Sequence, residues 1–105
     1  LFTFVGVLQI DGNLIDVNRS PLEAGGLTRE DVVGQKFWDC PWWNYDALVQ
    51  SRLREALRLA MTGQVVRYDE TFRMAGDTRM IIDFMLQPVT ESERVKFVVA
   101  SGVDV

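Results

Sequence analysis

The sequence feature that most limits the fold is a single long amphipathic helix. Between Tyr45 and Thr62, apolar residues recur every three or four positions with polar residues between them, and Gly63 follows where such a helix would end. The apolar positions are Val49, Leu53, Ala56, Leu57, Ala60 and Met61. A parallel sheet needs a crossover of about a dozen residues, usually a helix, between successive strands. Because one long helix cannot provide several crossovers, the pattern disfavours a parallel α/β fold.

Strand-like segments flank this helix on both sides. The turn signal Asp11-Gly12-Asn13 joins the first two into a predicted hairpin, and residues 88–94 are expected to separate the last two strands. The order predicts an α+β fold, in which short helices and one long helix pack on one face of a five-stranded antiparallel sheet. The predicted strands are 2–10, 14–17, 65–73, 78–87 and 95–103.

Short, irregular structure is expected between the first hairpin and the long helix. Asn18 and Pro21 are typical of a helix start, and that helix should run only to about Ala24 before a pair of glycines. A second single-turn helix is expected from Thr28 to Gly34. The aromatic run FWDCPWW that follows contains a proline, which prevents one continuous helix.

The composition is that of one folded domain. Of 105 residues, 48% are apolar and 25% are charged, close to the average for folded proteins. The net charge of −4 argues against a nucleic-acid-binding surface, because such surfaces gather Lys and Arg. No apolar run reaches the roughly 18 residues that span a bilayer, so direct membrane insertion is not expected. Cys40 is the only cysteine, and a chain that can form no internal disulfide suits a cytoplasmic location.

The chain contains no histidine, which excludes many kinds of site. Ser-His and Cys-His catalysis, His-ligated haem and most zinc sites all need an imidazole. The nearest approach to an acid pair is Asp69, Glu70 and Asp83, but strand alternation places Asp69 and Asp83 toward solvent. We therefore expect no catalytic residue, no metal site and no cofactor in this domain.

Several short motifs together carry a resemblance to a known family. They are Gly12 with Asn18, the turn Asp31-Val32-Val33-Gly34, the run FWDCPWW at 37–43, and the closing Gly102-Val103-Asp104-Val105. This combination resembles the PAS family, and the aromatic run resembles a bacterial sensory-box subgroup of it. The resemblance implies that residues 1–105 form a single PAS sensor domain, a fragment of a larger signalling protein. It also implies that Gly102 and Asp104 lead the signal into an output domain in cis.

The resemblance implies a regulatory function rather than an enzymatic one. The expected parent is a bacterial sensor histidine kinase in a two-component phosphorelay, and the alternative is a diguanylate cyclase or phosphodiesterase. In the light-sensing branch of the family the reactive cysteine would correspond to Phe37, whereas Cys40 lies three positions later. The haem-binding branch uses a histidine on the long helix. Both departures disfavour a flavin or haem cofactor.

The aromatic segment allows two interpretations. Its rings could line a pocket for a small apolar ligand between the long helix and the sheet, or they could fill the core of a small domain. Apolar pockets and apolar cores use the same residue types, so both interpretations stand. The candidate ligand-binding residues are Phe37, Trp38, Trp42, Trp43, Leu53, Leu57, Met80, Ile82, Phe84 and Val99.

Two further features concern charge and surface. Glu70 is the charged residue on an otherwise apolar strand face, and we expect it to pair with Arg67 or Arg73, a ligand cation or water. Ile81 and Met85 make the second face of the following strand partly apolar. That face either docks a flanking helix or a second copy in a homodimer, or carries scattered surface residues.

Overall fold

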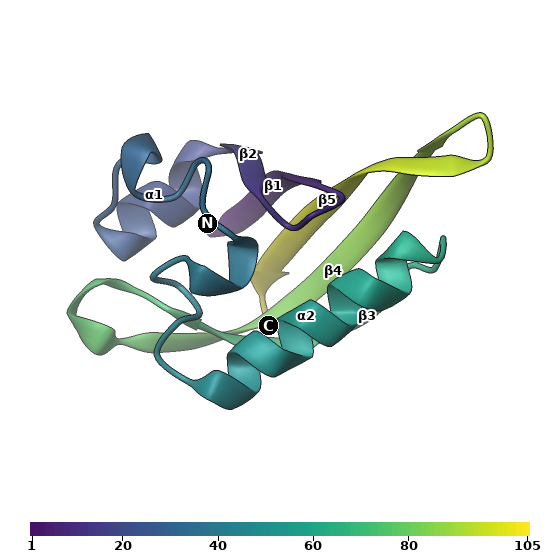
Figure 1. The fold of residues 1–105 in the computed structure, drawn as a ribbon. Helices are drawn as coiled ribbons and strands as arrows, with labels where there is room; N and C mark the ends of the chain where they lie inside the picture. The colour runs from purple at the N-terminus through teal and green to yellow at the C-terminus, as the bar shows by residue number, and fades with distance from the viewer.

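The computed structural model describes residues 1–105 and places a helical layer on one face of a curved sheet (Figure 1). The long helix α2 runs obliquely across the sheet, and the β4–β5 hairpin projects beyond the body of the molecule (Figure 1). The strands are β1 (Thr3–Gln9), β2 (Leu14–Val17), β3 (Val66–Arg73), β4 (Arg79–Glu91) and β5 (Arg94–Asp104). The helices are α1 (Arg19–Gly25) and α2 (Ala47–Met61), with single 3₁₀ turns η1 (Arg29–Asp31), η2 (Phe37–Asp39) and η3 (Ala75–Asp77).

The sheet has the strand order β2-β1-β5-β4-β3, and every neighbouring pair is antiparallel. The predicted α+β class, with five antiparallel strands and one long helix, is confirmed. The N-terminal hairpin joins the C-terminal meander through the pairing of β1 with β5, from Thr3 with Val103 to Gln9 with Phe97. The first and last strands of the chain therefore lie side by side in the middle of the sheet.

The β4–β5 hairpin is longer than the sequence predicts. The prediction that residues 88–94 separate the two strands was wrong, because only Ser92 and Glu93 lie between them, with φ of 52° and 66°. Pro88 is tolerated within β4 because the pairing of β4 with β3 stops at Leu86, which lies opposite Val66, the first residue of β3. Beyond that point β4 has one neighbouring strand, so that a missing N–H can face the free edge.

Alternation along the strands builds the core beneath α2. One row crosses four strands through the pairs Phe4 with Gly102, Gly102 with Phe84, and Phe84 with Tyr68. Gly102 has no side chain to add to this row, and a Cβ there would lie 2.8 Å from Ile82 Cδ1. The two phenylalanine rings therefore occupy the inner face on either side of it.

The apolar face of α2 covers this core. Its buried residues are Val49, Leu53, Ala56, Leu57 and Ala60. Asp46 caps the helix by accepting a 2.7 Å hydrogen bond from the Leu48 amide. Neither helix has the length and apolar character that a bilayer crossing requires.

Candidate functional site

The predicted aromatic residues converge on one cluster between α2 and the sheet. Phe37 from η2 stacks on Phe84 of β4 with ring centroids 6.1 Å apart, and Trp43 contacts the edge of each at 5.5 and 5.6 Å. Trp42 lies alongside and stacks on Phe72 at 6.1 Å. All five side chains are almost completely buried. The rings fill the space between the layers, and none of the five hollows on the molecule is lined by Phe37, Trp42, Trp43 or Phe84.

The other candidate residues divide between the centre and the border of this cluster. Leu53, Leu57 and Ile82 are buried, and Met80 packs partly exposed against them. Trp38 lies at the border, where its ring meets the turn at Gly12 and the guanidinium of Arg54 at 5.7 Å.

The placement of Val99 in the site was wrong by one residue. Val98 and Ala100 are fully buried, whereas Val99 lies between them on the opposite face of β5. The sequence VVA reads as apolar throughout, so its alternation could not show which valine points inward.

The two neighbouring indoles differ in their hydrogen bonds. The Trp42 Nε1–H donates to the carbonyl of Pro21 at 3.0 Å, whereas the equally buried Trp43 Nε1–H has no acceptor. Leaving a buried donor unpaired costs about 1–3 kcal/mol. Trp43 therefore carries an unused hydrogen-bond donor in an otherwise apolar cluster.

An ion pair between the buried Glu70 and the half-exposed Arg52 lies beside the cluster, and Arg52 is not the partner that the sequence predicted. Glu70 is 2% exposed and binds Arg52 of α2 through two bonds of 2.8 and 3.0 Å. The Thr71 amide donates a third bond to the same carboxylate at 3.0 Å. The expected partners are engaged elsewhere, Arg67 with Asp83 and Arg73 with the carbonyl of Pro41. Arg52 lies 18 residues away in sequence, so only the helix-on-sheet packing reveals it.

Tyr68 lies beside this ion pair on the inner face of β3. Its hydroxyl oxygen is buried and has no hydrogen-bond partner, although its ring contacts Phe84 at 5.6 Å. Burial, and then the adjacent Glu70 carboxylate, raise the pKa of Tyr68 well above its usual range. The phenol therefore remains a protonated donor.

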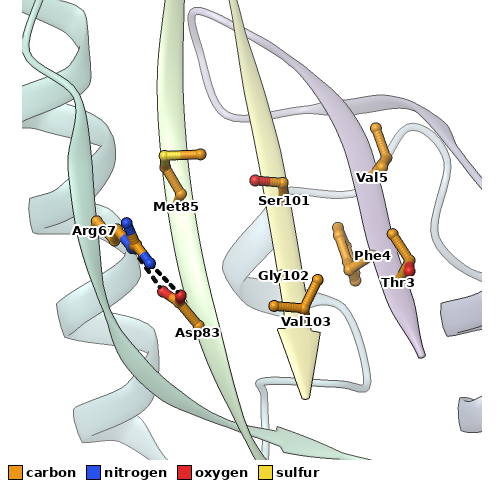
Figure 2. Close-up of a pocket in the computed structure, with 9 residues that line it drawn as sticks. All are labelled: Thr3, Phe4, Val5, Arg67, Asp83, Met85, Ser101, Gly102 and Val103. Carbon is orange, nitrogen blue, oxygen red and sulfur yellow. Dashed lines mark hydrogen bonds and ion pairs between the residues drawn. The ribbon is translucent and has the colours of Figure 1, made fainter. Parts of the chain in front are cut away.

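The opposite face of the sheet carries a shallow hollow of about 260 Å³ (Figure 2). Figure 2 shows Val5, Ser101, Met85 and Arg67 in a row across four strands, with Arg67 turned toward Asp83. The Arg67 guanidinium donates two bonds to Asp83, at 2.6 and 2.9 Å, and holds the pKa of that carboxyl below its usual range. Ile81 on this face is 56% exposed.

Cys40 is a core residue. Its side chain is fully buried, and burial raises the pKa of the thiol to about 12. A thiol held in this form is a poor nucleophile at neutral pH.

The residues expected to carry the signal out lie at the end of β5. Gly102 is buried against Phe4 and Ile82, whereas Asp104 is exposed and pairs with Ile82 of β4. The Val105 amide continues the ladder to the Ile81 carbonyl at 3.3 Å. The end of β5 is thus held between β1 and β4, directly beside the aromatic cluster.

Comparisons with known proteins agree with this arrangement. Residues 3–105 match the family described as PAS fold. Hybrid signal transduction histidine kinase D of Dictyostelium discoideum is 40% identical over 91 residues, which make up 85% of this chain and 6% of that protein. Sensor histidine kinase TmoS of Ectopseudomonas mendocina is 33% identical over 105 residues, which make up 97% of this chain and 11% of that protein.

A solved structure shows the same architecture. The PAS domain of Bordetella pertussis BvgS superposes with a TM-score of 0.77 at 16% identity, covering 98% of this chain and 76% of that one. The fold, with five antiparallel strands and a helical layer on one face, agrees with the family match over residues 3–105. The chain belongs to the PAS fold family.

Proposed function

We propose that this domain is the sensory part of a cytoplasmic histidine kinase in a two-component phosphorelay, where it forms one PAS domain of a longer chain. The observation that carries the proposal is that two relatives, 40% and 33% identical, are histidine kinases of which the matched chain forms only 6% and 11%. In this proposal the domain is regulatory, and the phosphotransfer chemistry belongs to an output domain in cis.

The proposed signal is a small apolar ligand that displaces or separates the central rings. The unpaired Trp43 Nε1–H supports this, since a ligand carrying one acceptor would satisfy a buried donor that no other group of the chain bonds. Phe84 would pass the displacement to Gly102, its partner on β5, and then to Asp104. The ligand would contact Phe37, Trp38, Trp42, Trp43, Leu53, Leu57, Met80, Ile82 and Phe84.

A thermal-shift screen of metabolites tests the ligand proposal, because a compound that binds the native state raises Tm with concentration. For a compound that does so, Trp43→Phe should reduce the shift, whereas Trp42→Phe should lower the basal Tm and keep the shift, since the Trp42 N–H is already used. The same compound should change autophosphorylation of the full-length protein. A parent chain without a kinase core, or a compound set that never moves Tm, would reject the proposal.

A second candidate function is self-association through the outer face of the sheet. It is favoured by the exposed apolar side chains Val5, Ile81 and Val103. The hollow that Val5, Val103 and Arg67 help to line also favours it (Figure 2). Light scattering of the 105-residue chain at rising concentration tests it. A dimer that Ile81→Asp or Met85→Asp dissociates would support this function, and a monomer at every concentration would exclude it.

A further inference from the structure

Asn18 stands at the N-cap of α1 but does not cap the helix with its side chain. It has the extended backbone of an N-cap residue, yet its side chain makes no hydrogen bond to the helix. Asparagine is favoured at this position because its side-chain oxygen normally accepts a bond from an N–H group of the first turn. Asn18 forgoes that local bond, and its side chain is used elsewhere.

The Asn18 side chain bonds the outer edge of β1. Its Oδ1 accepts from the Val5 N–H at 2.8 Å, and its Nδ2–H donates to the Thr3 carbonyl at 2.7 Å. The backbone N–H of Asn18 donates to the Val5 carbonyl at 3.0 Å. The Thr3 N–H donates to Ser20 Oγ at 3.2 Å. All four backbone groups that Thr3 and Val5 present on this edge thus have partners from the start of α1.

No strand covers this part of β1. The pairing of β1 with β2 stops where Gly6 lies opposite Val17, the residue just before Asn18. A side-chain amide has the same donor and acceptor as a peptide group, so Asn18 takes the place of a strand at the point where β2 ends. Without it, the edge of β1 would present unpaired N–H and C=O groups.

The constraint at this edge reaches the end of β5 through one residue pair. Because the N–H groups of Thr3 and Val5 point toward α1, that of Phe4 between them points the other way, toward β5. Phe4 is paired there with Gly102. Asn18 and the end of β5 therefore hold the same short stretch of β1 from opposite sides.

The start of α1 is also tied to the aromatic cluster. The Trp42 Nε1–H donates to the carbonyl of Pro21, which lies in α1 shortly after Asn18. The Trp42 ring stacks on Phe72 and contacts the edge of Phe4 at 5.1 Å. One indole and one amide thus connect the cluster, α1 and the edge of β1.

We propose that Asn18 is a positioning residue for signal output: its side chain fixes the start of β1, and the β1–β5 ladder passes that constraint to the end of β5. The inference rests on the proposed sensory function, in which the output segment follows β5. A displacement of Trp42 would then move α1, and Asn18 would transmit the movement to the Phe4–Gly102 pair.

Amide hydrogen exchange of the 105-residue chain tests where the constraint acts. In Asn18→Ala the amides of Phe4 and Gly102 should exchange about 10-fold faster than in the wild-type chain, because β1 loses two bonds on its outer edge and opens locally. Leu8 and Val98 form a pair at the far end of the same ladder. Their amides should change no more than the loss of global stability requires.

The matched control is Asp46→Ala. It removes a side-chain bond of the same kind at the start of α2, where Asp46 accepts from the Leu48 N–H. In this variant the exchange of Phe4 and Gly102 should change only as much as global stability does. Equal acceleration in Asp46→Ala and Asn18→Ala would overturn the positioning role.

Asn18→Asp offers a rescue that depends on the donor. Its ionised carboxylate has no proton for the Thr3 carbonyl, whereas the neutral acid has both a donor and an acceptor, as the amide has. Acid should therefore return the Val5 amide signal toward its wild-type position in Asn18→Asp and not in Asn18→Ala. Asp16, which Arg29 binds at 2.8 Å, titrates in both variants and is the reference. Identical acid responses of Val5 would overturn the role of the amide.

The output role is tested in the full-length protein. Asn18→Ala should change autophosphorylation by at least about fivefold in either direction, whereas Asp46→Ala should leave it within about twofold. Faster exchange at Phe4 with unchanged autophosphorylation would overturn the output role and leave the sensory function in place. A full-length protein without kinase activity would instead reject the proposed function, and the output role with it.

Discussion

Gly12 is required both by the backbone conformation of its turn and by the packing of side chains around it. The turn between β1 and β2 gives it a φ of +93°, a region that favours glycine. A Cβ at this position would lie 2.5 Å from the ring of Trp38 and 3.2 Å from Leu57. Trp38 of η2 and Leu57 of α2 thus both pack against the hairpin at Gly12, a position where no side chain fits.

Gly12→Ala is therefore expected to destabilise the fold more than an alanine at another left-handed glycine. Gly34 is the matched control, since it has a φ of +89° and no atom within 4 Å of a Cβ. Gly34→Ala should cost about 1–2 kcal/mol from backbone strain alone. Gly12→Ala should cost about 1–3 kcal/mol more, because the Trp38 ring must move. Urea unfolding measures both, and equal losses would contradict the packing argument.

The pair Arg67 and Asp83 makes a prediction about pH. The folded pKa of Asp83 is depressed, so its ionised form contributes stability that is present above the ordinary Asp pKa of about 3.9 and is lost as pH falls through the folded pKa. Carboxyl ¹³C NMR should give Asp83 a midpoint below that ordinary value, and Arg67→Gln should raise it. Arg79→Gln, which removes the partner of Asp77, should leave the Asp83 midpoint unchanged.

At the scale of elements, the sequence predicted the structures that depend on neighbouring residues but not the contacts between distant segments. The periodicity around Leu53 and Leu57 and the alternation from Met80 to Leu86 predicted α2 and β4, because each needs only neighbours in the chain. The Arg52–Glu70 pair and the β1–β5 ladder join distant segments, and no local pattern records them. The aromatic segment was identified, but its sequence could not distinguish a filled core from a pocket.

The β4–β5 hairpin carries local strain that can be relieved. Ser92 and Glu93 both have positive φ, which costs about 1–3 kcal/mol per residue for side chains other than glycine. Asn-Gly is the pair most suited to two successive positive φ angles. Ser92→Asn with Glu93→Gly should therefore raise stability by about 1 kcal/mol in urea unfolding. A loss of stability would contradict this account of the turn.

The ion pair that joins α2 to β3 should respond asymmetrically to mutation. Arg52→Met leaves the Glu70 carboxylate buried without its partner and should cost about 2–3 kcal/mol, less than a fully buried pair because Arg52 is half exposed. Arg52→Met with Glu70→Leu should recover most of that loss in urea unfolding. Arg58→Met, in the exposed pair with Glu55, is the control and should have little effect. An uncorrected loss in the double variant would contradict this interpretation.

At the scale of the whole molecule, one core holds all elements together. The buried cluster contains 20 residues, drawn from the sheet, α2, the aromatic segment and the turn at Val32, and Cys40 lies within it. A domain with a single core of this kind unfolds as one unit. Access to the Cys40 thiol therefore reports on unfolding of the entire chain.

Cys40 links stability to alkaline pH. Its folded pKa of about 12 lies above the ordinary value of about 8.5, so the folded state retains a proton that the unfolded state releases between these values. The unfolding free energy should therefore fall as pH rises through this window, and Cys40→Ala should remove that part of the slope. At neutral pH the rate of Cys40 thiol labelling should increase with urea concentration as steeply as the equilibrium constant of global unfolding does. A weaker dependence on urea would show that Cys40 is exposed by local unfolding of the core.

The pairing of Thr3 with Val103 determines how the domain responds to mechanical load. The start of β1 and the end of β5 lie next to each other because the two strands are antiparallel. Tension applied through the two chain ends would therefore separate the strands from that side, breaking the β1–β5 hydrogen bonds one after another. Such a ladder yields at lower force than strands that must slide past each other and lose all their bonds together. A small displacement of a segment that flanks the domain can thus break the first β1–β5 hydrogen bonds, near Thr3 and Val103, while the other hydrogen bonds and the core stay intact.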